Sequence, residues 1–160
     1  MAGSGLTLRG DERLKRALKQ FPDRVQRGAK KGMKTGLVRV QRSARKDAPV
    51  DRGRLRQSIA TEVRECGLNV RGAVGSAVDY APYVEFGTAP HWPPLSALQP
   101  WAERHGFPPG RAGAFLVARS IAQTGTPETR FLRNAVRDNT RRVWQDIKRG
   151  IGRELDRLGR

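Results

Sequence analysis

The sequence predicts an α+β fold, in which a small antiparallel β-hairpin is flanked by long N-terminal and C-terminal basic helices and followed by a proline-rich helical insertion. Apolar or small residues recur at steps of three or four over 11–47 and 130–158, which is the period of a helix. Over 59–74 they alternate with polar residues, which is the period of a strand. Six prolines within 89–109 exclude a long regular element there. With 160 residues, a single domain is expected.

The N-terminal region is predicted to hold an arm and two helices. Residues 1–10 contain three glycines and a serine, and we expect them to form a flexible arm. Residues 11–47 have a helical period, with lysine and arginine filling the faces away from the apolar one. Because Pro22 has no N–H, we expect a short helix over 11–20 and a second helix from Pro22 to about Lys46.

Residues 55–88 are predicted to form a hairpin and an aromatic turn. Alternation from Ile59 indicates one strand and alternation from Leu68 to Val74 a second, with a tight turn at 66–67. In the stretch "VDYAPYVEFGT" that follows, Pro82 is suited to open a short helical turn and Gly87 to close it.

The aromatic residues of this turn are expected to share one face. They fall at steps of three, at Tyr80, Tyr83 and Phe86. Burial of such a face would anchor the turn on the hairpin, so the stretch is interpreted as a structural corner and not an active site, with exposure to a neighbouring subunit left open.

Residues 89–127 are interpreted as an insertion with short helices, and residues 130–158 as the C-terminal helix. One insertion helix is expected within 96–106, with Pro100 near its start. Another is expected over 111–123, ended by Gly125.

The charge is strongly positive and unevenly placed. The chain has 32 lysines and arginines against 15 acidic residues, a formal net charge of +17. Most of the excess lies in residues 1–50 and 130–160, while 51–129 are nearly neutral. This balance indicates a polyanionic partner or a surface that works near one. Cys66 is the only cysteine, and no stretch has the length and apolarity of a membrane span, so cytoplasm-like conditions and no membrane contact are expected.

The residues of acid–base, nucleophilic and metal chemistry do not gather in a recognisable pattern. His91 and His105 lie fourteen residues apart without a cysteine at ligand spacing. Asp79 and Glu85 could form a carboxylate pair, but an arginine or a helix N-terminus is the simpler partner for Glu85. We therefore expect no catalytic, cofactor or metal site, and no enzyme.

The two basic helices are the better candidates for function, since they could line a channel or follow a phosphate backbone. Non-specific contact with DNA or with an acidic protein ring is expected of them. The candidate contact residues are Lys30, Lys31, Lys34, Arg39, Arg42, Arg141, Arg142, Lys148 and Arg149.

Three blocks of the sequence resemble a known family. They are "APVDRGRLRQSI" at 48–59, "VGSAVDYAPYVEFGT" at 74–88 and "TRFLRNAV" at 129–136. They are similar to the blocks A-P-V-D-T-G-x-L-x-x-S-I, Y-A-x-Y-V-E-F-G-T and P-F-L-x-P-A of the tail-component family of long-tailed bacteriophages. The chain departs from that pattern at Arg52, Arg130 and Asn134.

The resemblance implies structural or subunit-contact roles for the matching residues. They are Pro49, Asp51, Gly53, Leu55, Ser58, Ile59, Tyr80, Tyr83, Val84, Glu85, Phe86, Gly87, Thr88, Phe131 and Leu132. It also implies a non-enzymatic neck, tail-completion or head–tail joining protein of a virion, in a phage or a phage-derived particle such as a gene transfer agent. Assembly in the host cytoplasm goes with that role.

The implied partners are those of a tail. A homo-oligomeric ring, expected to be a hexamer, would meet a tail terminator or major tail tube protein, head–tail connector proteins and the tape-measure protein, with non-specific contact to packaged DNA. The alternative is a stand-alone nucleic-acid-binding protein, which predicts tight DNA binding with a steep salt dependence.

Overall fold

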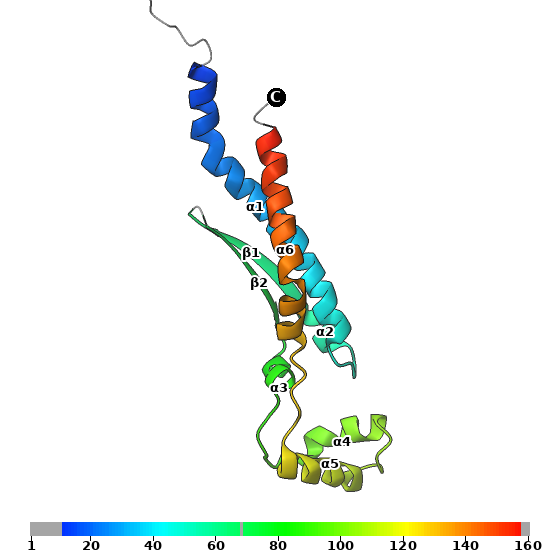
Figure 1. Cartoon of the computed structure of the whole chain (residues 1–160). Coiled ribbons are helices and arrows are strands. Elements are labelled where there is room, and N and C mark those ends of the chain that lie inside the picture. Colours follow the sequence, from blue (N-terminus) through cyan, green and yellow to red (C-terminus); the bar gives the residue numbers. More distant parts are fainter. Residues whose placement is uncertain (1–10, 68, 158–160) are drawn as a thin grey trace, which may run out of the picture. The chain divides into compact units, whose positions relative to one another are not determined.

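The computed structural model describes residues 11–67 and 69–157 and confirms the α+β fold (Figure 1). Its elements are α1 (Asp11–Asp47), α2 (Arg54–Ser58), β1 (Ile59–Cys66), β2 (Asn69–Ser76), α3 (Ala81–Phe86), α4 (Leu95–Arg104), α5 (Arg111–Thr124) and α6 (Phe131–Asp156). The predicted arm, Leu68 and the end of the C-terminal helix at residue 158 lie outside the described residues.

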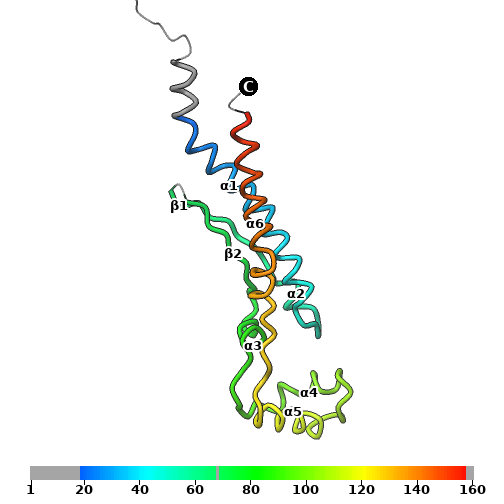
Figure 2. Tube along the Cα trace, viewed as in Figure 1, coloured from blue at the N-terminus to red at the C-terminus, as the bar shows by residue number. Residues whose placement is uncertain are grey.

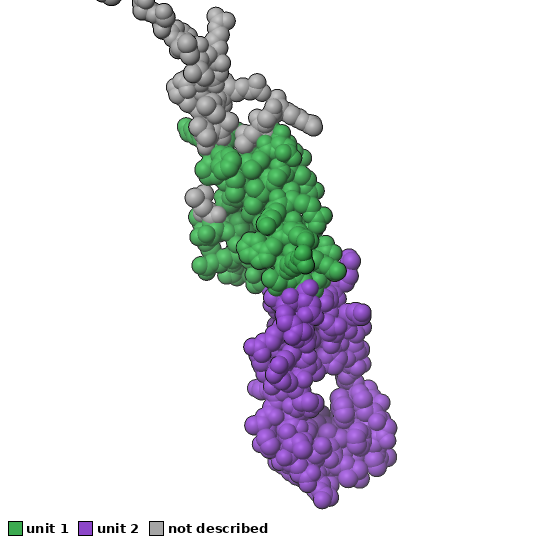
Figure 3. All heavy atoms as spheres, viewed as in Figure 1, with its two compact units in different colours: residues 1–39, 61–73, 139–160 green, residues 40–60, 74–138 purple. Residues whose placement is uncertain are grey.

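The strands β1 and β2 pair as a two-stranded sheet, as the alternation predicts. The chain groups into two compact units, shown in separate colours in Figure 3. The first unit comprises residues 1–39, 61–73 and 139–160, and the second 40–60 and 74–138. Four elements, α1, β1, β2 and α6, therefore contribute to both units, and the tube in Figure 2 lets each be followed along the chain.

Within the first unit, α1 and α6 touch through their backbones. A Cβ atom on Gly28 would lie 2.6 Å from the Cα of Ile151, and one on Gly36 would lie 2.9 Å from Cγ1 of Val143. A Cβ on Gly32, between them, would meet the backbone of Asp146. The order of these contacts runs in opposite directions along the two helices, so they are antiparallel. We call Gly28, Gly32 and Gly36 the glycine seam; side chains there would push the helices apart.

The predicted break at Pro22 is wrong, because α1 continues through it. Proline removes a single i→i−4 hydrogen bond, and the turns on either side keep theirs. Pro100 likewise lies inside α4 and not near its start. Ser96, whose carbonyl loses its partner, is exposed and can be solvated. The short helix α2 falls where the sequence pattern predicted none.

The second unit has a core made mostly of aliphatic side chains. The fully or almost fully buried residues include Val40, Ala44, Leu55, Ile59 and Phe131. The insertion forms α4 and α5, and α5 ends at Gly125 with φ of 73°, as predicted. Buried alanines at 102, 114 and 118 let the two insertion helices approach closely.

Candidate assembly and nucleic-acid interface

Glu85 is the centre of the second block and caps the C-terminal helix. Its side chain is 4% exposed. One carboxylate oxygen accepts a hydrogen bond from the backbone N–H of Leu132 at 2.8 Å, and the other accepts one from Arg133 at 2.9 Å. Helix N-termini carry unpaired N–H groups and a partial positive charge, which a carboxylate satisfies. Of the two partners that the sequence left open, Glu85 therefore takes the helix N-terminus.

The backbone of the same block is joined to the start of α6. Thr129 donates hydrogen bonds to the carbonyl of Val84 from its N–H at 3.1 Å and from its hydroxyl at 2.8 Å. Arg130 donates its N–H to the carbonyl of Glu85 at 3.0 Å. Phe131, the next residue, is completely buried. The second and third blocks thus form one clamp, which we call the Glu85 clamp, defined by residues 84–85 and 129–133.

Gly87 and Thr88 extend this connection. Thr88 and Thr126 exchange backbone hydrogen bonds at 3.1 and 3.2 Å, and their hydroxyls lie 2.9 Å apart. Gly87 has φ of 71°, and a Cβ atom there would collide with the carbonyl oxygen of Thr126. Glycine is therefore required at position 87 both by its backbone conformation and by the space available.

Asp51 of the first block forms an ion pair with the insertion. Both carboxylate oxygens accept hydrogen bonds from Arg104, at 2.8 and 2.6 Å. The hydrogen bond from Arg104 holds the pKa of Asp51 below its usual value, and the same contact raises the pKa of Arg104. In the same block Leu55 and Ile59 are buried, and the Ser58 hydroxyl lies 2.7 Å from that of Ser76. Pro49 is exposed and Gly53, with φ of 76°, precedes α2.

The predicted burial of the aromatic face of α3 is wrong. Tyr83 is 62% exposed and Phe86 is 67% exposed, while Ala81 and Glu85 are buried. Residues 81 and 85 are one helical turn apart, and the Glu85 clamp fixes their side of α3 toward α6. The steps of three from Tyr80 then place the aromatic rings on the other sides of this short helix.

Two open hollows of about 700 Å³ lie beside these aromatic rings. Tyr83 lines a hollow of about 720 Å³ together with Pro90 and Ile121. Phe86 lines another of about 700 Å³ with Leu132 and Val136. The motif block therefore combines a buried anchor with exposed apolar rings, the kind of surface that commonly marks protein contacts.

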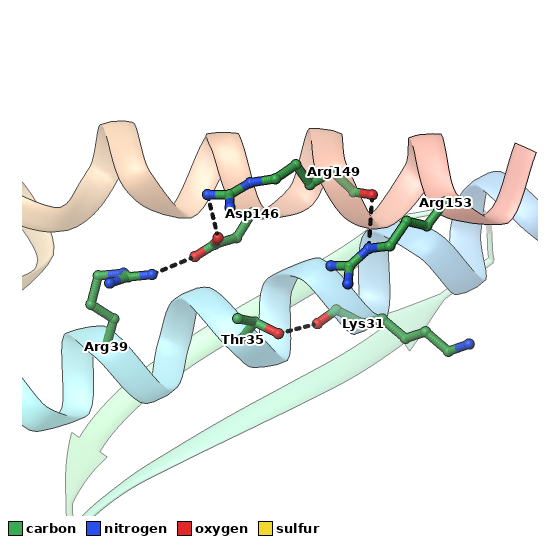
Figure 4. A network of polar contacts seen from close by, with 6 residues as sticks. All are labelled: Lys31, Thr35, Arg39, Asp146, Arg149 and Arg153. Carbon is green, nitrogen blue, oxygen red and sulfur yellow. Dashed lines mark hydrogen bonds and ion pairs between the residues drawn. The ribbon is translucent and has the colours of Figure 1, made fainter. Parts of the chain in front are cut away.

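Within the first unit, several of the predicted contact cations are bound to buried carboxylates. Asp146 accepts hydrogen bonds from Arg39 at 3.3 Å and from Arg149 at 3.0 Å (Figure 4). Lys31 pairs with Glu154 at 2.6 Å, and its hydrogen bond lowers the pKa of that carboxyl. Lys30 pairs with Glu65 at 2.9 Å. Lys31 and Arg39 thereby join α1 to α6, Lys30 joins α1 to the exposed Glu65 of β1, and Arg149 pairs within α6.

The other predicted contact cations are exposed, and none of them has a carboxylate partner among the described residues. They are Lys34, Arg42, Arg141, Arg142 and Lys148. Unpaired, exposed cations are available to a polyanion in a way that Asp146-bound arginines are not.

A comparison with known protein families finds a match for the N-terminal part of the chain. Residues 12–87 match the HK97-gp10-like family. That family is described as "Bacteriophage HK97-gp10, putative tail-component". The resemblance noted in the sequence is thereby confirmed over these residues, and it indicates a structural protein of a phage tail. No curated protein and no solved structure matches the chain.

The HK97-gp10-like match covers the first block and the second block up to Gly87. It also includes the whole glycine seam, whose residues recur every four positions and were not among the predicted functional residues. The match ends before the insertion, where Arg104 pairs with Asp51, and before the third block, whose backbone N–H groups bind Glu85. The four-residue spacing of these three glycines could have indicated the seam. Nothing in the sequence near positions 104, 126 or 129 indicates their partners.

Membrane-spanning helices and metal-binding clusters are both absent from the described residues. None of the helices there is long and apolar enough to cross a membrane. Nor do three or more histidines, cysteines or acidic residues gather there in a metal-binding arrangement.

Proposed function

We propose that this chain is a structural component of the tail of a phage or phage-like particle, and that it acts in tail completion or head–tail joining by forming a ring at the head-proximal end of the tail tube. The match of residues 12–87 to a phage tail-component family carries this proposal. The ring would assemble in the host cytoplasm and remain in the virion. A tail terminator or tube protein, connector proteins and the tape-measure protein are its proposed neighbours.

The exposed rings of α3 support a role in subunit contact. Tyr83 and Phe86 lie beside apolar hollows on a helix whose opposite side is fixed by the Glu85 clamp. Large aromatic residues held on a rigid element lose little conformational freedom on binding and are enriched at interface centres. We assign this surface, defined by Tyr83, Phe86 and their hollows, to contact between neighbouring subunits.

The test images purified particles made with and without this chain and looks for an extra ring at the head-proximal end of the tail. Tails that are unfinished or unattached without the chain, and completed when it is restored, are the expected result. A Tyr83→Ser, Phe86→Ser variant should melt like the wild type and fail to restore the ring. Phe115→Ser, which alters an exposed ring on α5, is the matched control and should restore it.

A stand-alone nucleic-acid-binding protein is the second candidate. It is favoured by the exposed cations that have no carboxylate partner among the described residues. The same experiment separates the two. Unchanged particles, together with a free protein that binds DNA at moderate salt, would overturn the tail assignment and leave the second candidate.

A further inference from the structure

One face of α6 combines an exposed tryptophan with exposed cations one helical turn to either side. Trp144 is 60% exposed. Arg141 precedes it by three residues and Lys148 follows it by four, so the three lie on one face of the helix. We call these three residues the Trp144 face.

The Trp144 face borders the side of α6 that packs on α1. The glycine seam contacts Val143, Asp146, Ile147 and Ile151. At about 100° per residue, Arg141 and Lys148 lie on the side of Trp144 that faces away from Val143 and Asp146, while Ile147 and Ile151 border Trp144 on its other side. Packing against α1 leaves 60% of Trp144 exposed, so most of the indole is available to a ligand.

Among the residues that the structure describes, neither Arg141 nor Lys148 has a carboxylate partner. The buried carboxylates of α6, Asp146 and Glu154, are occupied by cations other than Arg141 and Lys148. Two uncompensated cations on a chain of net charge +17 favour an anionic ligand. The indole adds a flat surface on which a base can stack, and a cation–π contribution from a neighbouring arginine is available.

We propose that the Trp144 face binds single-stranded nucleic acid, with Arg141 and Lys148 on the phosphates and a base stacked on the indole. The two cations are about 10 Å apart along the helix, close to three nucleotides at the 3.4 Å rise of one strand. Bases in a duplex are already stacked on each other, whereas a single strand presents a free face. The proposal does not depend on ring formation.

The test measures binding of a fluorescein-labelled oligothymidine, and of a duplex of the same length, by anisotropy over a range of NaCl concentrations. Trp144→Ala should weaken binding of the single strand by about fivefold or more and change duplex binding less. An Arg141→Gln, Lys148→Gln variant should reduce the slope of log K against log [NaCl] by about 1.4, since each phosphate contact contributes about 0.7 to that slope. In a Trp92→Phe, Trp101→Phe background, the remaining fluorescence of Trp144 should be quenched by the oligonucleotide.

Matched controls come from the second unit. Trp92→Ala removes another exposed indole, and Arg111→Gln with Arg119→Gln removes two exposed cations of α5. Both should bind the single strand like the wild type, and all variants are compared after melting curves show that they fold.

Equal effects of Trp144→Ala and Trp92→Ala would overturn the proposal, as would an equal loss on single strand and duplex. If Trp144→Ala instead left oligonucleotide binding intact and prevented incorporation into particles, the face would be a protein contact. Particle imaging decides the tail assignment independently, because a chain that forms the ring without binding the oligonucleotide refutes only this inference.

Discussion

Removing the carboxylate of Glu85 should destabilise the second unit more than any exposed acidic substitution. In Glu85→Ala, the N–H groups of Leu132 and Arg133 lose their acceptors in a nearly closed site. An unsatisfied buried donor costs about 1–3 kcal/mol, and loss of a charge at a helix N-terminus adds about 0.3–1 kcal/mol. Partial access of water to the two donors brings the expected loss to roughly 3 kcal/mol.

For a chain of this size each kcal/mol shifts the melting temperature by about 2–4 °C, so Glu85→Ala should melt about 6–12 °C below the wild type. Circular dichroism melts and urea titrations measure the change. Glu85→Gln, which keeps one acceptor oxygen, should lie between the two. Glu103→Gln is the control, because Glu103 is exposed. A Glu85→Ala protein that melts within about 2 °C of that control would refute the capping role.

Two further predictions concern the first unit and the ion pairs. Gly32→Ala should destabilise the protein by roughly 1–3 kcal/mol, because its methyl group meets the backbone of α6. Gly152→Ala, with open space around it, should stabilise the protein by up to about 1 kcal/mol. Equal effects of the two substitutions in thermal melts would contradict the glycine seam. Ion pairing lowers the pKa of Asp51 and Glu154, from ordinary values of 3.8 and 4.5, so their stabilisation is present near neutral pH and is lost as the pH falls through the folded values. The melting temperature should decrease as the pH is lowered below about 4, and it should decrease less steeply in Asp51→Asn. The same acid dependence in Asp51→Asn as in the wild type would show that the pair with Arg104 contributes nothing to stability.

The helices and strands were largely predictable because their signals are local. Helical spacing located α1 and α6, alternation located the hairpin, and Gly87 and Gly125 ended helices as expected, both with positive φ. The break expected at Pro22 does not occur, because a proline at this exposed position removes a single hydrogen bond and the neighbouring turns keep theirs.

Which side of each helix is buried was harder to predict. A step of three from Tyr80 to Phe86 shows that aromatic residues share a helix, but it does not say which side of the helix is buried. The buried side is set by Glu85, whose acceptors lie 47 and 48 residues further along the chain. In the same way, the cations of α1 and α6 look alike in sequence, and only the positions of Asp146 and Glu154 show which of them are paired with a buried carboxylate.

By itself, the sequence determined the α+β class, the strongly positive ends and the resemblance to phage tail components, since each depends on composition or on patterns within short windows. The tertiary structure alone decided that Glu85 caps α6, that Asp51 pairs with Arg104 and that Tyr83 and Phe86 face outward. These facts depend on residues far apart in the chain, and their pairing is fixed by packing and by the need of buried polar groups for partners.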